Sequence, residues 1–173
     1  MGAYNYIKDF LSRGGVSVFI STAVVKFSAA ILSIVVVRLL DKDDYGILAY
    51  ALSIYGIGIV ISGFGSQYSL LRYGSLLKSH LKRRDYYRAT MNHGVKYTAI
   101  ICLFVIVSAF FPFHPKGSAI YLILTGISLI SFFIIELQRS YFRILDLNRL
   151  YSRVNVVYSV AILIAVILLS WLI

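Results

Sequence analysis

A single lysine stands in the middle of an apolar run that is long enough to cross a lipid bilayer. In the run from Val16 to Val37, ten uncharged residues precede Lys26 and eleven follow it. At about 1.5 Å of rise per helical residue, its ammonium group would lie roughly 15 Å from either edge of the hydrocarbon layer. Exposing it to lipid there would cost at least about 3 kcal/mol. We therefore expect Lys26 to face a bundle interior, a partner or a wet cavity, and to attract an anion.

Other charged residues lie at the ends of apolar runs. Glu136 and Arg139 are one helical turn apart and can form an ion pair, and Glu136 is also a candidate for proton coupling. An ion pair between Glu136 and Lys26 is the structural alternative to a binding role for the lysine, but the two residues are predicted at different depths. Arg72 ends the second apolar run and begins a basic segment.

The sequence lacks the motifs of common enzyme and metal sites. It contains no phosphate-binding glycine loop, no HExxH motif and no nucleophile elbow. Its three histidines, His80, His93 and His114, are scattered, and its one cysteine, Cys102, lies inside an apolar run. Its aromatic residues do not alternate with basic ones as in nucleic-acid binding. We therefore predict a protein that is not an enzyme and that uses no metal, cofactor or nucleic acid.

Membrane-spanning helices are the elements expected to position these residues. Of the 173 residues, 60% are hydrophobic, which is typical of a polytopic membrane protein. We predict an all-α fold with residues 1–173 in a single transmembrane domain. A signal peptide is the competing interpretation of the first run, but that run continues beyond the about 15 apolar residues of such a segment. The predicted spans are 16–37, 45–71, 97–113, 118–135 and 154–173, with a cytoplasmic amphipathic segment at 73–92.

The distribution of positive charge predicts how the spans are oriented. If the N-terminus is cytoplasmic, thirteen of the seventeen Lys and Arg residues lie inside and three lie outside. The positive-inside rule then favours a multi-pass protein with a cytoplasmic N-terminus. The inside residues are Lys8, Arg13, Arg72, Lys78, Lys82, Arg83, Arg84, Arg88, Lys96, Arg139, Arg143, Arg149 and Arg153.

Small residues recur in the second run. Gly58, Ser62 and Ser66 repeat at intervals of four, which allows close helix packing, although a flexible segment facing a substrate is the alternative. The segment from Gly63 to Tyr68 is expected to loosen the helix near its inner end. The basic segment 73–92 is expected to bind anionic headgroups, or more specifically to collect a lipid that carries a diphosphate.

Three features carry a resemblance to a known family. A first span follows a short basic segment, and the turn from Arg38 to Gly46 reads Arg-Leu-Leu-Asp-Lys-Asp-Asp-Tyr-Gly. The stretch from Gly63-Phe-Gly65 through Leu71-Arg72-Tyr73 leaves the second span before the basic segment. These features are similar to the Arg-x-Leu-Gly-x-x-x-Tyr-Gly turn and second-span exit of Wzx-type polysaccharide flippases. The chain thus resembles the N-terminal part of members of the multidrug/oligosaccharidyl-lipid/polysaccharide exporter superfamily.

The resemblance implies a transport function. The cargo would be an undecaprenyl-diphosphate-linked oligosaccharide, such as an O-antigen, capsule or exopolysaccharide unit, moved across the bacterial inner membrane by alternating access. Lys26, Arg72 and Arg139 would bind substrate. The implied partners are the lipid-linked oligosaccharide, anionic membrane lipids and polysaccharide polymerase machinery. Because family members have twelve or more spans in two lobes, we expect five spans to form a partial N-terminal lobe that needs a C-terminal lobe.

Two alternatives stay open at this stage. One is a nontransporting membrane interaction protein, which would bind partner helices through Gly58, Ser62 and Ser66 and anionic lipid through its basic loops. The other is a fragment of a drug or amphiphile exporter from the same superfamily.

Overall fold

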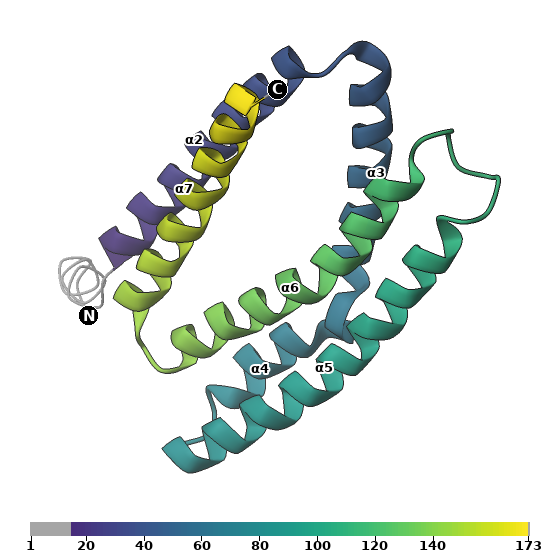
Figure 1. Cartoon of the computed structure of the whole chain (residues 1–173). Coiled ribbons are helices and arrows are strands. Elements are labelled where there is room, and N and C mark those ends of the chain that lie inside the picture. The colour runs from purple at the N-terminus through teal and green to yellow at the C-terminus, as the bar shows by residue number, and fades with distance from the viewer. Residues whose placement is uncertain (1–14, 173) are drawn as a thin grey trace. The chain divides into compact units, whose positions relative to one another are not determined.

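The computed structural model describes residues 15–172, and side chains as far as residue 168 (Figure 1). Five of the described helices are long and apolar enough to cross a membrane. The predicted all-α, multi-pass membrane fold is therefore confirmed. Lys8 and Arg13, two of the residues predicted to be cytoplasmic, lie outside the described residues.

The chain divides into two compact units, residues 1–41 with 145–173 and residues 42–144. The first unit contains α2 and α7, and the second contains α3, a short 3-10 helix η1, α4, α5 and α6. Their bounds are Gly15–Leu39 for α2, Lys42–Ile61 for α3, Ser62–Gly65 for η1, Ser66–Gly74 for α4, His80–Ser108 for α5, Ala119–Ile144 for α6 and Asn148–Leu172 for α7.

In the first unit, α2 and α7 pack side by side (Figure 1). The buried residues of α2 are small, namely Ser21 and Ser28, and α7 buries Ser152 and Asn155. Lipid tails are as apolar as leucine, so small residues that let two backbones approach closely are the expected means of packing helices in a membrane. The hydroxyl of Ser21 donates a hydrogen bond to the carbonyl of Val18, which removes most of the cost of burying it.

In the second unit, α6 packs against α3, α4 and α5. Its buried residues recur every three or four positions along the whole helix, which is the pattern of a helix with one face in a core. They are Leu122, Gly126, Leu129, Phe133, Leu137, Ser140 and Ile144. The core of this unit is therefore organised around one face of α6.

Of the small-residue ridge, Gly58 lies in α3 and packs on α6, and Ser62 is the first residue of η1. Gly58 and Ser62 are buried, and a Cβ atom added to Gly58 would lie 2.8 Å from the Cδ1 atom of Leu129. A real Cβ atom would need the leucine side chain to move. The prediction that this ridge serves close helix packing is confirmed for Gly58 and Ser62, and the packing partner belongs to the same chain.

The helices extend beyond the apolar runs of the sequence. The predicted segment 73–92 is interrupted after Gly74, and its second part joins the third apolar run in the continuous helix α5. Similarly, α6 includes Glu136 and Arg139, and α7 includes Arg149 and Arg153. Hydropathy falls where a segment leaves the membrane, but Lys, Arg, Glu and Gln are good helix formers and the backbone hydrogen bonds continue.

Arg83 stabilises the interruption between α4 and α5. Its Nε atom donates to the carbonyl of Leu77 at 2.6 Å, and its Nη1 atom donates to the carbonyl of Ile144 at 3.2 Å. Ile144 is the last residue of α6, where carbonyl groups lack partners within the helix and a positive charge is favourable. Sequence alone groups Arg83 with the basic residues of the lipid-binding segment, whereas the structure shows its side chain bound to backbone carbonyls.

Replacing Arg83 with alanine is expected to lower the free energy of unfolding by about 2 kcal/mol, because hydrogen bonds from a charged donor are lost and two carbonyls lose a partner. The matched control is Arg84→Ala. Arg84 is exposed, and replacing it removes the same charge from the same helical turn. The check is the denaturation midpoint of the detergent-solubilised protein. Equal midpoints for the two variants would contradict the capping role.

Candidate functional site

Lys26 lies near the middle of α2. It lies eleven positions after Gly15 and thirteen before Leu39, so it is about 16 Å and 20 Å from the ends of the helix. It follows the buried residue Ser21 by five positions, which places it about 140° around the helix from the face that packs on α7. The Lys26 side chain is accordingly exposed, and it shares its face with Thr22 and Ser33, which are exposed as well.

Among the described residues of its own unit, Lys26 has no acidic residue at its depth. The acidic residues among the described positions of this unit are Asp41 and Asp146, and both lie in the connections outside α2 and α7. An ammonium group at mid-span needs a compensating charge or water. Neither α2 nor α7, as far as the structure describes them, contains an acidic residue that could supply that charge.

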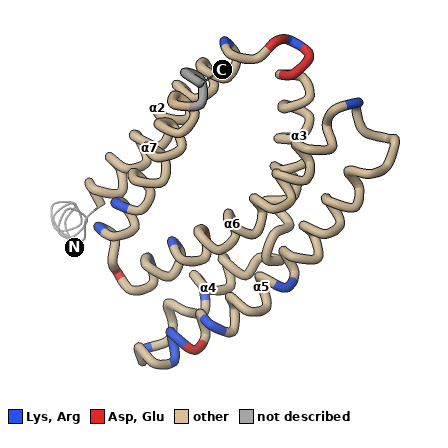
Figure 2. The backbone as a smooth tube through the Cα atoms, viewed as in Figure 1, with Lys and Arg blue, Asp and Glu red and all other residues tan. Residues whose placement is uncertain are grey.

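In the second unit, positive charges gather at the end where α4 is followed by α5 (Figure 2). Arg72 at the end of α4 is exposed, and its guanidinium carbon lies 5.7 Å from the ring centroid of Tyr73, within the range of a cation–π contact. Exposed basic residues continue the cluster, and they are Lys78, Lys82, Arg84 and Arg88.

Glu136 and Arg139 form an ion pair on α6, in which Nη1 of Arg139 donates to Oε1 of Glu136. The side chain of Arg139 is largely buried and that of Glu136 is partly exposed. Any substrate anion at Arg139 would therefore compete with a carboxylate one turn away.

The second span is interrupted between α3 and α4. Gly63, Phe64 and Gly65 have φ angles of 61°, 48° and 75°, and this left-handed conformation ends one helix and starts the next. The expected irregularity in the segment from Gly63 to Tyr68 is confirmed. Phe64 is 81% exposed, and its ring lies 5.8 Å from that of Tyr97.

A threonine of α5 supplies the hydrogen bond that the interrupted helix loses. The backbone N–H of Gly63 donates to Oγ1 of Thr98 at 3.0 Å, and the same hydroxyl donates to the carbonyl of Gly94 at 2.8 Å. Thr98 is completely buried. Irregular backbone is tolerated at membrane depth when neighbouring helices satisfy it in this way.

The ring of Phe133 is packed between the interruption and α5. Cβ atoms added to Gly63 and Gly94 would lie 2.1 Å and 2.0 Å from atoms of this ring. Only glycine at both positions leaves room for the phenyl group. The sequence predicts that the segment loosens the helix, whereas in the structure the interruption is held in one geometry by a hydrogen bond and an aromatic ring.

Thr98 and Phe133 are residues that sequence reasoning missed. For Thr98 a usable signal exists, because Gly94, Thr98 and Cys102 recur at intervals of four and are all buried. This is the small-residue pattern already noted for Gly58 and Ser62, and it indicates close packing. For Phe133 the sequence offers no comparable signal, since bulky apolar residues adjoin it on both sides, as in Phe132, Ile134 and Ile135.

Comparison with protein families gives one match, in which residues 11–173 fit the model of a family described as "Polysaccharide biosynthesis protein". Comparisons with curated proteins and with solved structures gave no match. The family match covers nearly the whole chain, including the turn from Arg38 to Gly46 and the interrupted second span, and it agrees with the five membrane-length helices. The chain therefore belongs to the polysaccharide biosynthesis protein family, the family of the Wzx-type flippases.

Proposed function

We propose that this chain takes part in moving a lipid-diphosphate-linked oligosaccharide across the bacterial inner membrane, with its N-terminus in the cytoplasm. The observation that carries the proposal is a lysine at the middle of a membrane-length helix, unmatched by any acidic residue of the α2–α7 pair among the described positions, in a member of the polysaccharide biosynthesis family. A transporter of an anionic lipid needs such a charge at this depth, because the diphosphate must leave water on its way across.

The strength of the attraction supports a role for Lys26 in binding the diphosphate. Two unit charges 4 Å apart attract each other by about 4 kcal/mol at an effective dielectric constant of 20, compared with about 1 kcal/mol in water. The attraction to Lys26 at mid-span therefore offsets part of the hydration free energy that the diphosphate loses when it leaves water. Enclosing the open face of α2 during alternating access requires further helices that oppose it.

The basic end of the second unit suits a first encounter with the same lipid. Each exposed Lys or Arg near an anionic bilayer surface contributes about 1 kcal/mol to attraction. Arg72 and the exposed basic residues that follow it, such as Lys82, form such a surface. We assign them to the cytoplasmic entrance, where they would raise the local concentration of the lipid-linked substrate without selecting its sugar.

The packing of α3 weighs against the nontransporting alternative. That alternative uses Gly58, Ser62 and Ser66 as a surface for partner helices. Gly58 and Ser62 are already buried in the second unit, where Gly58 packs against Leu129 of α6, and Ser66 is half-buried. The other alternative, a drug or amphiphile exporter, differs from the proposed flippase in its cargo. The positive charge of Lys26 favours anionic cargo over cationic compounds.

The experiment that tests the function compares cells with and without the complete native protein. Without it, we expect the lipid-linked oligosaccharide to accumulate on the cytoplasmic leaflet, out of reach of a lectin added to spheroplasts; with it, the lectin should bind. Equal lectin binding in the two strains would overturn the proposed transport. Loss of resistance to cationic dyes, with unchanged lectin binding, would assign the chain to amphiphile export instead.

A further inference from the structure

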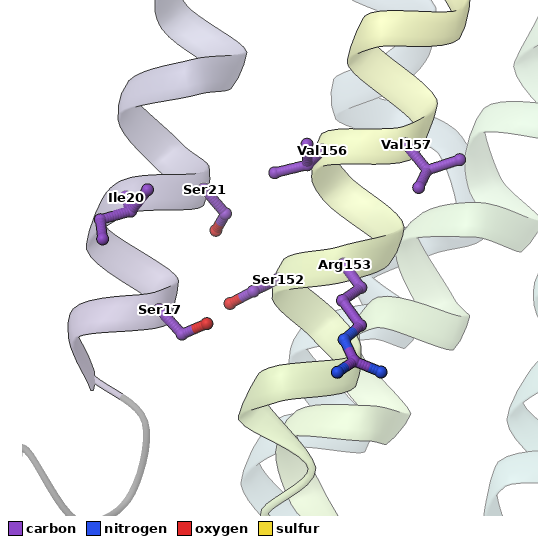
Figure 3. A pocket seen from close by; sticks show the side chains of 7 residues that line it. All are labelled: Ser17, Ile20, Ser21, Ser152, Arg153, Val156 and Val157. Carbon is purple, nitrogen blue, oxygen red and sulfur yellow. The ribbon is translucent and has the colours of Figure 1, made fainter.

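The first unit contains an open cavity of about 350 Å³ near the beginnings of α2 and α7 (Figure 3). All the residues that line it belong to these two helices. Its volume lies at the lower end of the range for ligand pockets, about 300–1,000 Å³. The proposed transport function does not use this cavity.

The polar part of the cavity consists of three serines. Ser17 and Ser21 come from α2 and Ser152 comes from α7, and the side chains of Ser17 and Ser152 point into the gap between the helices (Figure 3). Ser152 is only 3% exposed, and its Oγ atom has no hydrogen-bond partner among the described residues. An unpaired buried hydroxyl costs about 1–3 kcal/mol, so a ligand that bonds to it recovers that cost.

The charged part of the cavity is Arg153, the next residue on α7. Its side chain is exposed, and none of the ion pairs found among the described residues involves it. A guanidinium group presents its N–H donors in a planar fork that matches the oxygens of a phosphate group. One arginine balances the single negative charge of a phosphodiester, whereas a diphosphate would leave charge unbalanced here.

The rest of the lining is apolar, formed by Ile20, Val156 and Val157. A free phosphate ion would gain nothing from these side chains, but an acyl chain attached to a phosphate would bury surface against them. The depth agrees with such a ligand. Ser17 lies two residues after the start of α2 and Arg153 five residues after the start of α7, so both are within about 8 Å of a helix end.

We propose that this cavity binds one glycerophospholipid of the cytoplasmic leaflet. Arg153 and the hydroxyl of Ser152 contact the phosphodiester, and an acyl chain lies along Ile20, Val156 and Val157. The lipid is a resident of the α2–α7 seam rather than cargo, so this proposal stands or falls separately from the transport function.

The test is native mass spectrometry of the complete protein released from nanodiscs that contain phosphatidylglycerol and phosphatidylcholine. We expect the native protein to retain one phospholipid and Arg153→Gln to lower the apparent affinity at least tenfold. Arg149→Gln is the matched control, because Arg149 lies one turn earlier on α7, is exposed and does not line the cavity. It should retain the lipid as the native protein does.

Two further variants separate the cavity from general electrostatics. Ser152→Ala should lower the affinity a few-fold. Val156→Trp enlarges a lining side chain that points into the gap between the helices without changing charge, and it should abolish retention (Figure 3). Equal weakening by Arg149→Gln and Arg153→Gln, or retention that survives Val156→Trp, would overturn the proposal. Release of the lipid by millimolar inorganic phosphate would show that the site binds a free anion and would overturn it as well.

Discussion

Replacing Lys26 with leucine is expected to reduce export of the lipid-linked oligosaccharide at least a hundredfold while making insertion of α2 into the membrane more favourable. The loss follows because the variant lacks the attraction between the lysine and the diphosphate, about 4 kcal/mol at mid-span. Losing even two thirds of this free energy corresponds to a factor of about 100 in binding. The gain follows because a lysine at the centre of a span costs about 3 kcal/mol on insertion and leucine costs nothing. The measurements are lectin accessibility in spheroplasts and the amount of protein in the membrane fraction.

Three variants make this result specific. Lys26→Arg keeps the charge and should retain most of the export. Lys42→Gln removes a charge at the start of α3, outside the apolar core, and should leave export unchanged. Thr22→Val alters the same face of α2 one turn earlier at nearly constant volume and should have a small effect. Normal export by Lys26→Leu would rule out the assigned role, and loss of export in Thr22→Val would indicate that the face matters for packing rather than for charge.

The features that the sequence predicted depend on local composition. The position of Lys26 at mid-span follows from counting apolar residues on either side, because the thickness of the bilayer fixes the length of a span. The packing role of Gly58 and Ser62 follows from spacing, because residues four apart lie on one helix face. The Glu136–Arg139 contact follows from the same rule.

The features that the sequence did not predict depend on contacts between separate helices. Arg83 has the same side chain as its neighbour Arg84, and only the position of the α6 terminus decides which of them binds carbonyls. Thr98 meets Gly63 across 35 residues of chain. A charge or hydroxyl can be recognised in a sequence, but its partner is set by how helices pack.

The interruption of the second span has a consequence for any motion of this unit. A helix that bends freely would have unpaired backbone groups and open space at the bend. Here the N–H of Gly63 is bonded to Thr98 and the ring of Phe133 fills the space beside it. Rotation of α4 relative to α3 therefore has to break that hydrogen bond or displace that ring. We expect the rotated and unrotated arrangements of the two helices to be discrete states rather than the ends of a continuous range.

Replacing Gly63 with alanine is expected to lower the free energy of unfolding by about 2–5 kcal/mol. A left-handed φ angle costs a residue with a Cβ atom about 1–2 kcal/mol, and forcing extra volume into a packed core costs about 1–3 kcal/mol more. The Cβ atom would lie 2.1 Å from the ring of Phe133, so the ring must move. The measurement is the denaturation midpoint of the detergent-solubilised protein.

Gly65→Ala is the matched control, because Gly65 is also left-handed, with a φ angle of 75°, but a Cβ atom there would meet nothing within 4 Å. Only the backbone term applies, and the expected loss is about 1–2 kcal/mol. In a Phe133→Ala background, Gly63→Ala should cost no more than Gly65→Ala, because the ring it strikes is gone; a double-mutant cycle measures this coupling. If Gly63→Ala costs as much without the ring as with it, backbone conformation alone holds the interruption, and bending at α4 would need no displacement of Phe133.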